Sequence, residues 1–413
     1  MGAGIFRTPA LIAGIAESEA AVLAAWAAGG LLSIVGALCY AELAAAYPHA
    51  GGDYHFLHRA FGRRIAFLYA WARLTVIQTG SLALLAFVFG DYAARLAGFG
   101  PVGSAVFAGL AIVALTAINI VGIRASAGTQ NWLTAVELLG LALVIVAGLL
   151  IAPAEPVAPA GSASSNIGLI MVFVLLTYGG WSEAAYVSAE LRDVGRQIAP
   201  VMVGSLALVT VLYLLANLAY LRVLGLGGVA VSETVAAEVL DRAVGEPGAL
   251  LMSAMVAVAA LTSANATLIT GARTAYAMGA MHPQLALFGR WNPRTGTPTM
   301  AVIGQGAAAL TLVAIGSVTR KSFEIAVEFT APVFWLFFLL TGVSLFVLRA
   351  RDPSAPRPFR VPLFPLPPII FCATAAFLLY SSLAYTGVGA LLGIGVLVLG
   401  GAPLWIVERH PRS

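Results

Sequence analysis

The feature that most constrains this chain is a series of apolar blocks, each about twenty residues long, separated by turns and charged residues. The block from Val201 to Leu221 is one of them. At a rise of about 1.5 Å per residue, a helix of that length crosses the roughly 30 Å hydrocarbon core of a bilayer. Only 10% of the residues are charged, against about 25% in soluble domains. The sequence therefore predicts a protein embedded in a membrane.

The spanning elements are predicted to be helices, because lipid leaves only helices and closed barrels to satisfy the backbone, and the alternating segments of a barrel do not occur. After an incomplete apolar piece at 1–16, the predicted spans are 20–47, 62–97, 101–123, 128–152, 166–190, 198–225, 247–280, 298–316, 323–350, 363–383 and 386–408. The longer connections are 49–61, 153–165, 225–247 and the Pro-rich run 351–362. Of these, only 225–247 is long enough to hold short helices.

The basic residues predict the orientation. If 49–61 lies in the cytoplasm, most of the 22 Lys and Arg residues fall in cytoplasmic connections, as the positive-inside rule requires. The net charge of +4 then reflects membrane topology, so no nucleic-acid partner is implied. The two cysteines, Cys39 and Cys372, lie inside apolar blocks and are interpreted as small core residues.

Two of the apolar pieces are interrupted by glycines, at Gly2–Phe6 and at Tyr178–Trp181. With 1–16 counted as the first span, the second interruption falls in the sixth, which is the spacing of an inverted repeat of five helices. A broken helix exposes N–H groups at one half-helix start and C=O groups at the other half-helix end. Together such groups bind the carboxylate and the ammonium of an amino acid. The alternative is that the glycines only allow helices to pack closely.

Seven motifs through the chain carry a family resemblance. They are GAGIF at Gly2–Phe6, SIVGALCYAEL at Ser33–Leu43, GGDYHFLHRAFG at Gly51–Gly62, YGGW at Tyr178–Trp181, AELRDVGRQIAP at Ala189–Pro200, TSAN and TGAR within Thr262–Arg273, and LRARDPSAPRPFRVP at Leu348–Pro362. In this order they resemble the amino acid–polyamine–organocation transporters, and within them the L-type amino acid transporter branch and its bacterial relatives. The resemblance implies a multi-pass protein of a bacterial plasma (inner) membrane.

The fold implied by the resemblance is all-α, with twelve helices in the arrangement first known in sodium-coupled leucine transport. A transporter core at 1–350 would contain inverted repeats at roughly 1–152 and 166–350. A cytoplasmic loop at 351–362 and two peripheral helices within 363–408 would follow. The family has a half-helix before GAGIF that this sequence does not include. We expect an in-frame extension upstream of Met1 to encode it.

The resemblance also implies a substrate site. The amides of Gly2, Ala3, Gly4 and Ile5 would hold the substrate carboxylate. Carbonyls around Leu176, Thr177 and Tyr178, at the break that continues through Gly179, would hold the amine. Leu176 stands where many relatives have Phe, which either leaves room for a bulkier side chain or is a neutral packing change. Glu183 follows shortly after Gly180 and either lines the cavity or makes a polar contact at the half-helix start.

Glu137 is the first candidate for ion coupling, because it stands where sodium-independent relatives commonly have Lys. It lies about 14 Å along its helix from Gly128, and a carboxylate at that depth is costly and usually functional. It would take up a proton or hold a sodium ion; the alternative is a carboxylate solvated from the cytoplasm or paired with an Arg. Ser263 and Asn265 are the other candidates. No metal site or cofactor beyond a coupling ion is predicted.

The sequence thus predicts a secondary amino acid transporter that works by alternating access, as an exchanger or a symporter. A polyamine or amine carrier and a non-transporting amino acid sensor are the alternatives. Catalysis is not predicted, because all five histidines fall in connections or the tail. The connection at 95–102 contains no Cys, which excludes a disulfide-linked heavy subunit of the kind that human relatives have. Glu42, Arg73 and Glu328 are interpreted as structural ion-pair partners, and Tyr69 as a core or lipid-facing residue.

Overall fold

The computed structural model describes residues 3–49, 51–99, 101–122, 127–150, 166–190, 194–281, 285–319, 322–385, 387–402 and 404–405. Nearly all of these residues are helical, and nine helices among them are long and apolar enough to cross a membrane. The prediction of an all-helical, multi-pass membrane protein is confirmed. The inverted-repeat boundaries and the peripheral role of the last two spans stay predictions.

The elements of the first half of the chain are η1 (Ala3–Phe6), α1 (Thr8–Ile15), α2 (Glu19–Ala46), α3 (Asp53–Phe61), α4 (Arg63–Ala72), the π-helix η2 (Arg73–Ile77), α5 (Gln78–Leu96), α6 (Pro101–Val121) and α7 (Ala127–Leu150). Those of the second half are α8 (Ile167–Thr177), η3 (Trp181–Glu190), α9 (Val194–Val231), α10 (Val235–Val244), α11 (Glu246–Met281), α12 (Thr299–Thr319), α13 (Ser322–Arg351), α14 (Leu366–Tyr385) and α15 (Val388–Leu399). Helices α4, η2 and α5 together form one long span.

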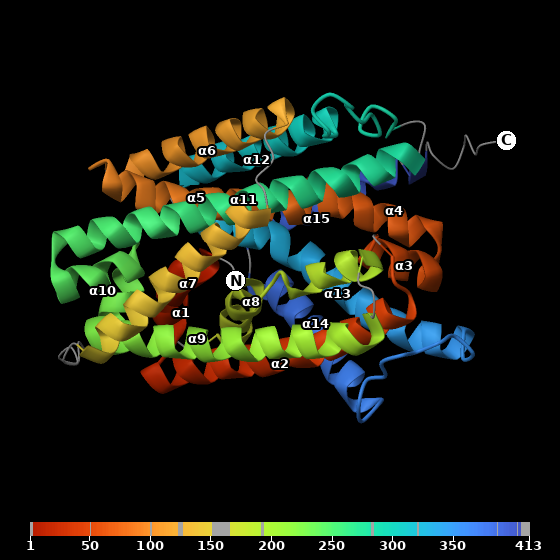
Figure 1. Cartoon of the computed structure of the whole chain (residues 1–413), viewed down its shortest axis with the longest axis horizontal. Helices are drawn as coiled ribbons and strands as arrows, with labels where there is room; N and C mark the ends of the chain where they lie inside the picture. Colours follow the sequence, from red (N-terminus) through yellow and green to blue (C-terminus); the bar gives the residue numbers. More distant parts are fainter. Residues whose placement is uncertain are drawn as a thin grey trace.

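The long helices run roughly along one direction and form a bundle around the short elements η1, α1 and α8 (Figure 1). Small residues set the close contacts: Gly30 of α2 lies against Thr210 of α9, and Gly306 of α12 lies against Thr116 of α6. Neither glycine has room for a Cβ atom. Such small-residue contacts are the usual means of packing helices in lipid.

The connections 49–61 and 225–247 lie at opposite ends of the bundle. Figure 1 shows α10, from the connection 225–247, at one end and α3, from the connection 49–61, at the other. The expectation of short helices within 225–247 is confirmed, since α9 kinks at Gly225 (φ 69°) and α10 follows. The expectation that only 225–247 holds short helices was wrong for 49–61, which contains the helix α3, whose N-cap Gly52 and C-cap Gly62 both have positive φ.

Candidate functional site

The first helix break is a single 3-10 turn, Ala3–Phe6, that leads into α1. The N–H groups of Ala3, Gly4 and Ile5 are the first amides of this turn, and none of them is bonded to another described residue outside the turn. Its carbonyl groups are satisfied from other helices: the Tyr92 hydroxyl donates to the carbonyl of Phe6 (3.0 Å) and the Tyr220 hydroxyl to that of Ile5 (3.5 Å). The turn therefore offers amides rather than carbonyls to a ligand. Gly2 lies outside the described residues.

The second break separates α8 from η3. Helix α8 ends at Thr177, and the chain turns through Gly180, whose φ of 98° favours glycine. The N–H of Gly179 donates to the carbonyl of Leu176 (3.0 Å), which gives that oxygen a partner. Within the described part of the chain, no backbone N–H donates to the carbonyls of Thr177 or Tyr178. These two oxygens are the acceptors that the break leaves for an ammonium group.

Aromatic contacts fix the second break in place. The Tyr178 ring packs against Trp26 of α2 and Tyr213 of α9, and its hydroxyl donates to the carbonyl of Trp26 (3.0 Å). On the other side of the turn, Trp181 packs against Tyr40 and Phe338. The Tyr178 side chain is thus committed to the scaffold, so Tyr178 contributes its backbone to the site.

The two breaks face each other. A Cβ atom added to Gly4 would lie 3.2 Å from the Thr177 side chain, and the hydroxyls of Thr177 and Thr8 are 2.9 Å apart. The structure therefore brings the predicted residues Ala3, Gly4 and Ile5 together with Thr177 and the break that follows it. This contact places the turn that carries the Gly4 amide beside the C-terminal end of α8. Leu176 is half-buried in the last turn of α8.

Glu183 of η3 is bound to Arg73. One guanidinium nitrogen, Nη2, donates to both carboxylate oxygens, at 2.9 and 2.8 Å, and such charge-assisted hydrogen bonds are stronger than neutral ones. The Arg73 side chain is 4% exposed and that of Glu183 is 36% exposed. Arg73 is the first residue of η2, and π-turns of this kind occur often at functional sites. The expectation that Arg73 forms a structural pair is confirmed, and the negative charge of Glu183 is neutralised by it.

A small cavity of about 30 Å³ lies beside this pair. Its lining comes from α2, α3, α4, η2, η3 and α13, and includes Tyr40, Asp53, Tyr69, Arg73, Ser182, Glu183 and Thr341. Asp53 was not among the residues predicted from the sequence, and Tyr69 was interpreted as a core or lipid-facing residue. Two signals were present: Asp53 directly follows Gly51 and Gly52 in a family motif, and Tyr186 stands one helical turn after Glu183.

The ion-coupling candidates are not gathered in one cluster. Glu137 of α7 is buried, and its Oε1 atom has no hydrogen-bond partner among the described residues. Asn265 of α11 instead accepts a hydrogen bond from the Asn119 side chain of α6 (2.6 Å), which gives its amide a role between two helices. Ser263 is half-buried on α11. Of the three, Glu137 has the buried polar atom that most needs a ligand.

An ion pair joins the start of α1 to the α10 end of the bundle. Arg7 lies 3.7 Å from the Asp91 carboxylate of α5, and it also donates to the carbonyl of Ser232 (3.3 Å). Ser232 stands between α9 and α10. This contact ties the element that carries the first break to α5 and to the α9–α10 connection.

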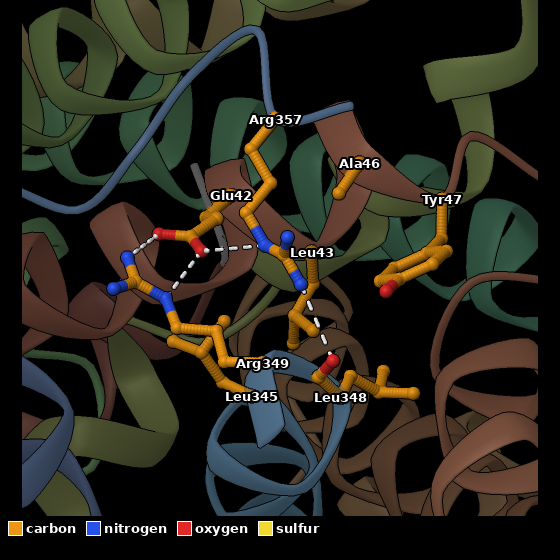
Figure 2. A pocket seen from close by; sticks show the side chains of 8 residues that line it. All are labelled: Glu42, Leu43, Ala46, Tyr47, Leu345, Leu348, Arg349 and Arg357. Atoms are coloured by element: carbon orange, nitrogen blue, oxygen red, sulfur yellow. Dashed lines mark hydrogen bonds and ion pairs between the residues drawn. The ribbon is translucent and has the colours of Figure 1, made fainter. Parts of the chain in front are cut away.

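A second buried carboxylate, Glu42 of α2, anchors the Pro-rich connection 351–362 (Figure 2). The Glu42 side chain is 1% exposed. It accepts hydrogen bonds from Arg349 of α13 (2.7 Å to Oε1) and from the backbone N–H of Val361 (2.7 Å to Oε2), while Arg357 lies 3.7 Å away. The expectation of a structural ion pair is confirmed for Glu42; for Glu328 it stays a prediction.

Two facing helix breaks in a multi-pass bundle are an arrangement that recurs in membrane transporters. Residues 1–398 match the sequence profile of the family described as amino acid permease. The chain belongs to the amino acid permease family. It is accordingly a transporter and not an enzyme.

Individual relatives agree with this assignment over nearly the whole chain. The chain is 31% identical to the mouse b(0,+)-type amino acid transporter 1 over 390 residues, which cover 92% of this chain and 78% of the relative. It is 27% identical to the serine/threonine exchanger SteT of Bacillus subtilis over 419 residues, covering 100% and 94%. It is 30% identical to the mouse large neutral amino acids transporter small subunit 2 over 415 residues, covering 97% and 76%.

Proposed function

We propose that this protein is a secondary active amino acid transporter that holds its substrate between the two helix breaks and works by alternating access. The amides of Gly2, Ala3, Gly4 and Ile5 bind the α-carboxylate. The carbonyls of the Leu176–Gly179 turn, chiefly those of Thr177 and Tyr178, bind the ammonium. The observation that carries the proposal is the contact of Gly4 with Thr177, because it brings unpaired donors and unpaired acceptors to one place.

The state of Glu183 favours an amino acid over a polyamine or simple amine. An amine carrier needs a carboxylate that is free to pair with the cation, since a buried cation without a partner is strongly disfavoured. Glu183 lies in the cavity wall, but Arg73 binds both of its oxygens. Because Arg73 occupies both of its oxygens, Glu183 also has no free carboxylate for the side chain of a cationic amino acid substrate. We therefore place Glu183 at the edge of the substrate site and infer that the substrates are neutral amino acids.

The names of the relatives support the same class. One is named a serine/threonine exchanger and another a large neutral amino acids transporter. We propose that the present chain exchanges neutral amino acids across a bacterial plasma membrane, with the α3 end of the bundle in the cytoplasm. Both of its cysteines are free, and Cys39 is buried. We propose that it needs no disulfide-linked partner. A non-transporting sensor would bind the same ligands without flux in proteoliposomes.

Descarboxy analogues test the carboxylate assignment. We expect the amine that lacks the α-carboxylate to bind about 100-fold more weakly than its parent amino acid, because at least two charge-assisted hydrogen bonds of about 1.5–3 kcal/mol each are lost. The measurement is isothermal titration calorimetry on the purified protein, with the N-acetyl derivative as the matched analogue that removes the ammonium. Equal affinity for the amine and the amino acid would favour the amine carrier instead.

The Glu137→Gln variant tests ion coupling. If the coupling ion is a proton held at Glu137, uptake into proteoliposomes should rise as external pH falls, and the variant should exchange substrate independently of pH. If the ion is sodium bound by Glu137 and Ser263, uptake should depend on external sodium at fixed pH, and the variant should lose that dependence. A buried neutral carboxyl costs less than an uncompensated charge, so we expect the proton result. Normal transport by the variant under every ion condition would make Glu137 structural.

A further inference from the structure

Three oxygen atoms near the α3 end of the bundle form a closed triangle. Asp53 Oδ2 lies 3.1 Å from the Tyr69 hydroxyl and 3.2 Å from the Tyr186 hydroxyl, and the two hydroxyls are 2.6 Å apart. All three distances lie within or close to the range of hydrogen bonds between oxygens. The atoms come from α3, α4 and η3, so the triangle joins α3 to the span that begins with α4 and to η3, which follows the second break.

The triangle has one proton too few if Asp53 is ionised. Each tyrosine hydroxyl carries a single proton, and a carboxylate carries none. Two protons can serve only two of the three oxygen–oxygen contacts, so in the third contact lone pairs face each other. One further proton on the Asp53 carboxyl places a hydrogen in every contact. The three oxygens can therefore form a ring of three hydrogen bonds, and the ring is complete only when the site has bound one proton.

The surroundings of Asp53 also favour the neutral form. Its other oxygen accepts a hydrogen bond from the Thr341 hydroxyl of α13 (3.2 Å). Asp53 is 4% exposed, and this burial raises the pKa of its carboxyl. The charged and titratable groups that face Asp53 from the neighbouring elements are Tyr40 of α2, Tyr69 of α4, Arg73 of η2, and Glu183 and Tyr186 of η3.

These neighbours do not neutralise Asp53. Arg73 donates to the Tyr69 hydroxyl (3.2 Å) rather than to Asp53. It also donates to both carboxylate oxygens of Glu183. The pair carries no net charge, so an ionised Asp53 would leave one uncompensated negative charge among these groups. A buried charge of that kind is strongly unfavourable. A bound proton removes it.

The backbone at Gly52 is shaped to allow this contact. Its φ is 46°, a value that residues other than glycine rarely adopt. An added Cβ atom would lie 2.7 Å from the Tyr186 ring. Any other residue at position 52 would push Tyr186 away from Asp53. Glycine at position 52 therefore allows Tyr186 to approach Asp53, in addition to starting α3.

We propose that Asp53, Tyr69 and Tyr186 form a proton-binding site in which one bound proton completes the ring and holds η3 against α3 and α4. The site is separate from Glu137, which lies on α7. Proton release breaks one of the three contacts and so loosens the attachment of the half-helix that follows the substrate-binding break. The proposal depends on the geometry of the triangle and not on which substrate is transported.

Infrared difference spectroscopy of the purified full chain tests the site, with pH as the only variable and no substrate present. We expect a C=O stretch of a protonated carboxyl that grows as pH falls and is absent in Asp53→Asn, whose amide has the size of the protonated acid. All spectra are compared in the Glu137→Gln background, so that a proton on Glu137 adds no band of its own, and Glu137→Gln alone should retain the Asp53 band. A band that remains unchanged in Asp53→Asn at every pH would overturn the proposal, as would the absence of any protonated carboxyl in the parent protein.

The Tyr186→Phe variant tests the ring itself. The variant leaves only one contact, between Asp53 Oδ2 and the Tyr69 hydroxyl. The Tyr69 proton already serves this contact, so no proton is missing when Asp53 is ionised. We expect protonation of Asp53 to need a proton concentration about tenfold higher, the equivalent of one lost hydrogen bond. Tyr380→Phe, on the exposed face of α14, should leave the titration unchanged. An unaltered titration in a folded Tyr186→Phe protein would show that Asp53 binds its proton without the ring, which contradicts the proposal.

Discussion

Replacing Gly4 with valine is expected to abolish amino acid binding while the protein remains folded and inserted in the membrane. A Cβ atom at this position would already lie 3.2 Å from Thr177, and the two methyl groups beyond it would occupy the space in front of the amides of Ala3, Gly4 and Ile5. The substrate carboxylate would then lose hydrogen bonds of about 1.5–3 kcal/mol each. Calorimetric titration should show an affinity loss of about 100-fold or more.

Gly14→Val provides the matched control. Gly14 lies in α1, the helix that follows the η1 turn, and a Cβ atom added to it would meet nothing within 4 Å. This variant should bind amino acids like the parent protein. Melting temperatures of both variants in detergent separate lost binding from lost folding. Parent-like affinity in Gly4→Val would remove the helix 1 amides from the substrate site, and with them the proposed mode of carboxylate binding.

Replacing Glu42 with glutamine is expected to give a large loss of stability. The side chain is 1% exposed and contacts Arg349, Arg357 and the N–H of Val361. Without the carboxylate, the Arg349 guanidinium remains partly buried with no counter-charge, and removing one partner of a buried pair costs roughly 3–5 kcal/mol. Because Glu42 anchors the connection 351–362, we expect limited proteolysis to cut that connection faster in the variant.

Glu19→Gln is the control for this prediction. Glu19 lies on the same helix, α2, but is exposed in its first turn, where the loss of one carboxylate costs only a few tenths of a kcal/mol to about 1 kcal/mol. The expected order of melting temperatures is parent, then Glu19→Gln close below it, and Glu42→Gln far lower. If the two variants melt together, the Glu42 cluster does not hold the connection in place.

The sequence was a sound guide wherever a local pattern has a single physical outcome. Apolar blocks long enough to span a bilayer can only be helices in lipid, and the structure has helices there. Glycines inside an apolar span weaken the helix locally: the described part of the first interruption, Ala3–Phe6, is a 3-10 turn, and the second, at Tyr178–Trp181, separates α8 from η3. The expectation that the connection 49–61 holds no helix was wrong, because the short amphipathic helix α3, capped by glycines, resembles a loop when only apolar length is considered.

Charged residues in the spans were found by sequence, but their partners were not. Burial depth alone predicts that Glu42 and Arg73 need counter-charges. Their partners, Arg349 and Glu183, lie 307 and 110 residues away, and no local pattern specifies such a distance. The interpretation of Glu183 changed most, because its pairing with Arg73 neutralises the charge that an amine would need.

The sequence by itself determined that this chain is a helical membrane protein with two glycine breaks five spans apart, since hydropathy, helix length and glycine content act locally. Only the tertiary structure decided what those breaks face and which polar groups stay unpaired. It placed Gly4 against Thr177 and brought Asp53, Tyr69 and Tyr186 within hydrogen-bonding distance. The reason is physical: a hydrogen bond depends on a few tenths of an ångström between atoms from different helices, and that distance is set by how the helices pack, not by any one segment of the chain.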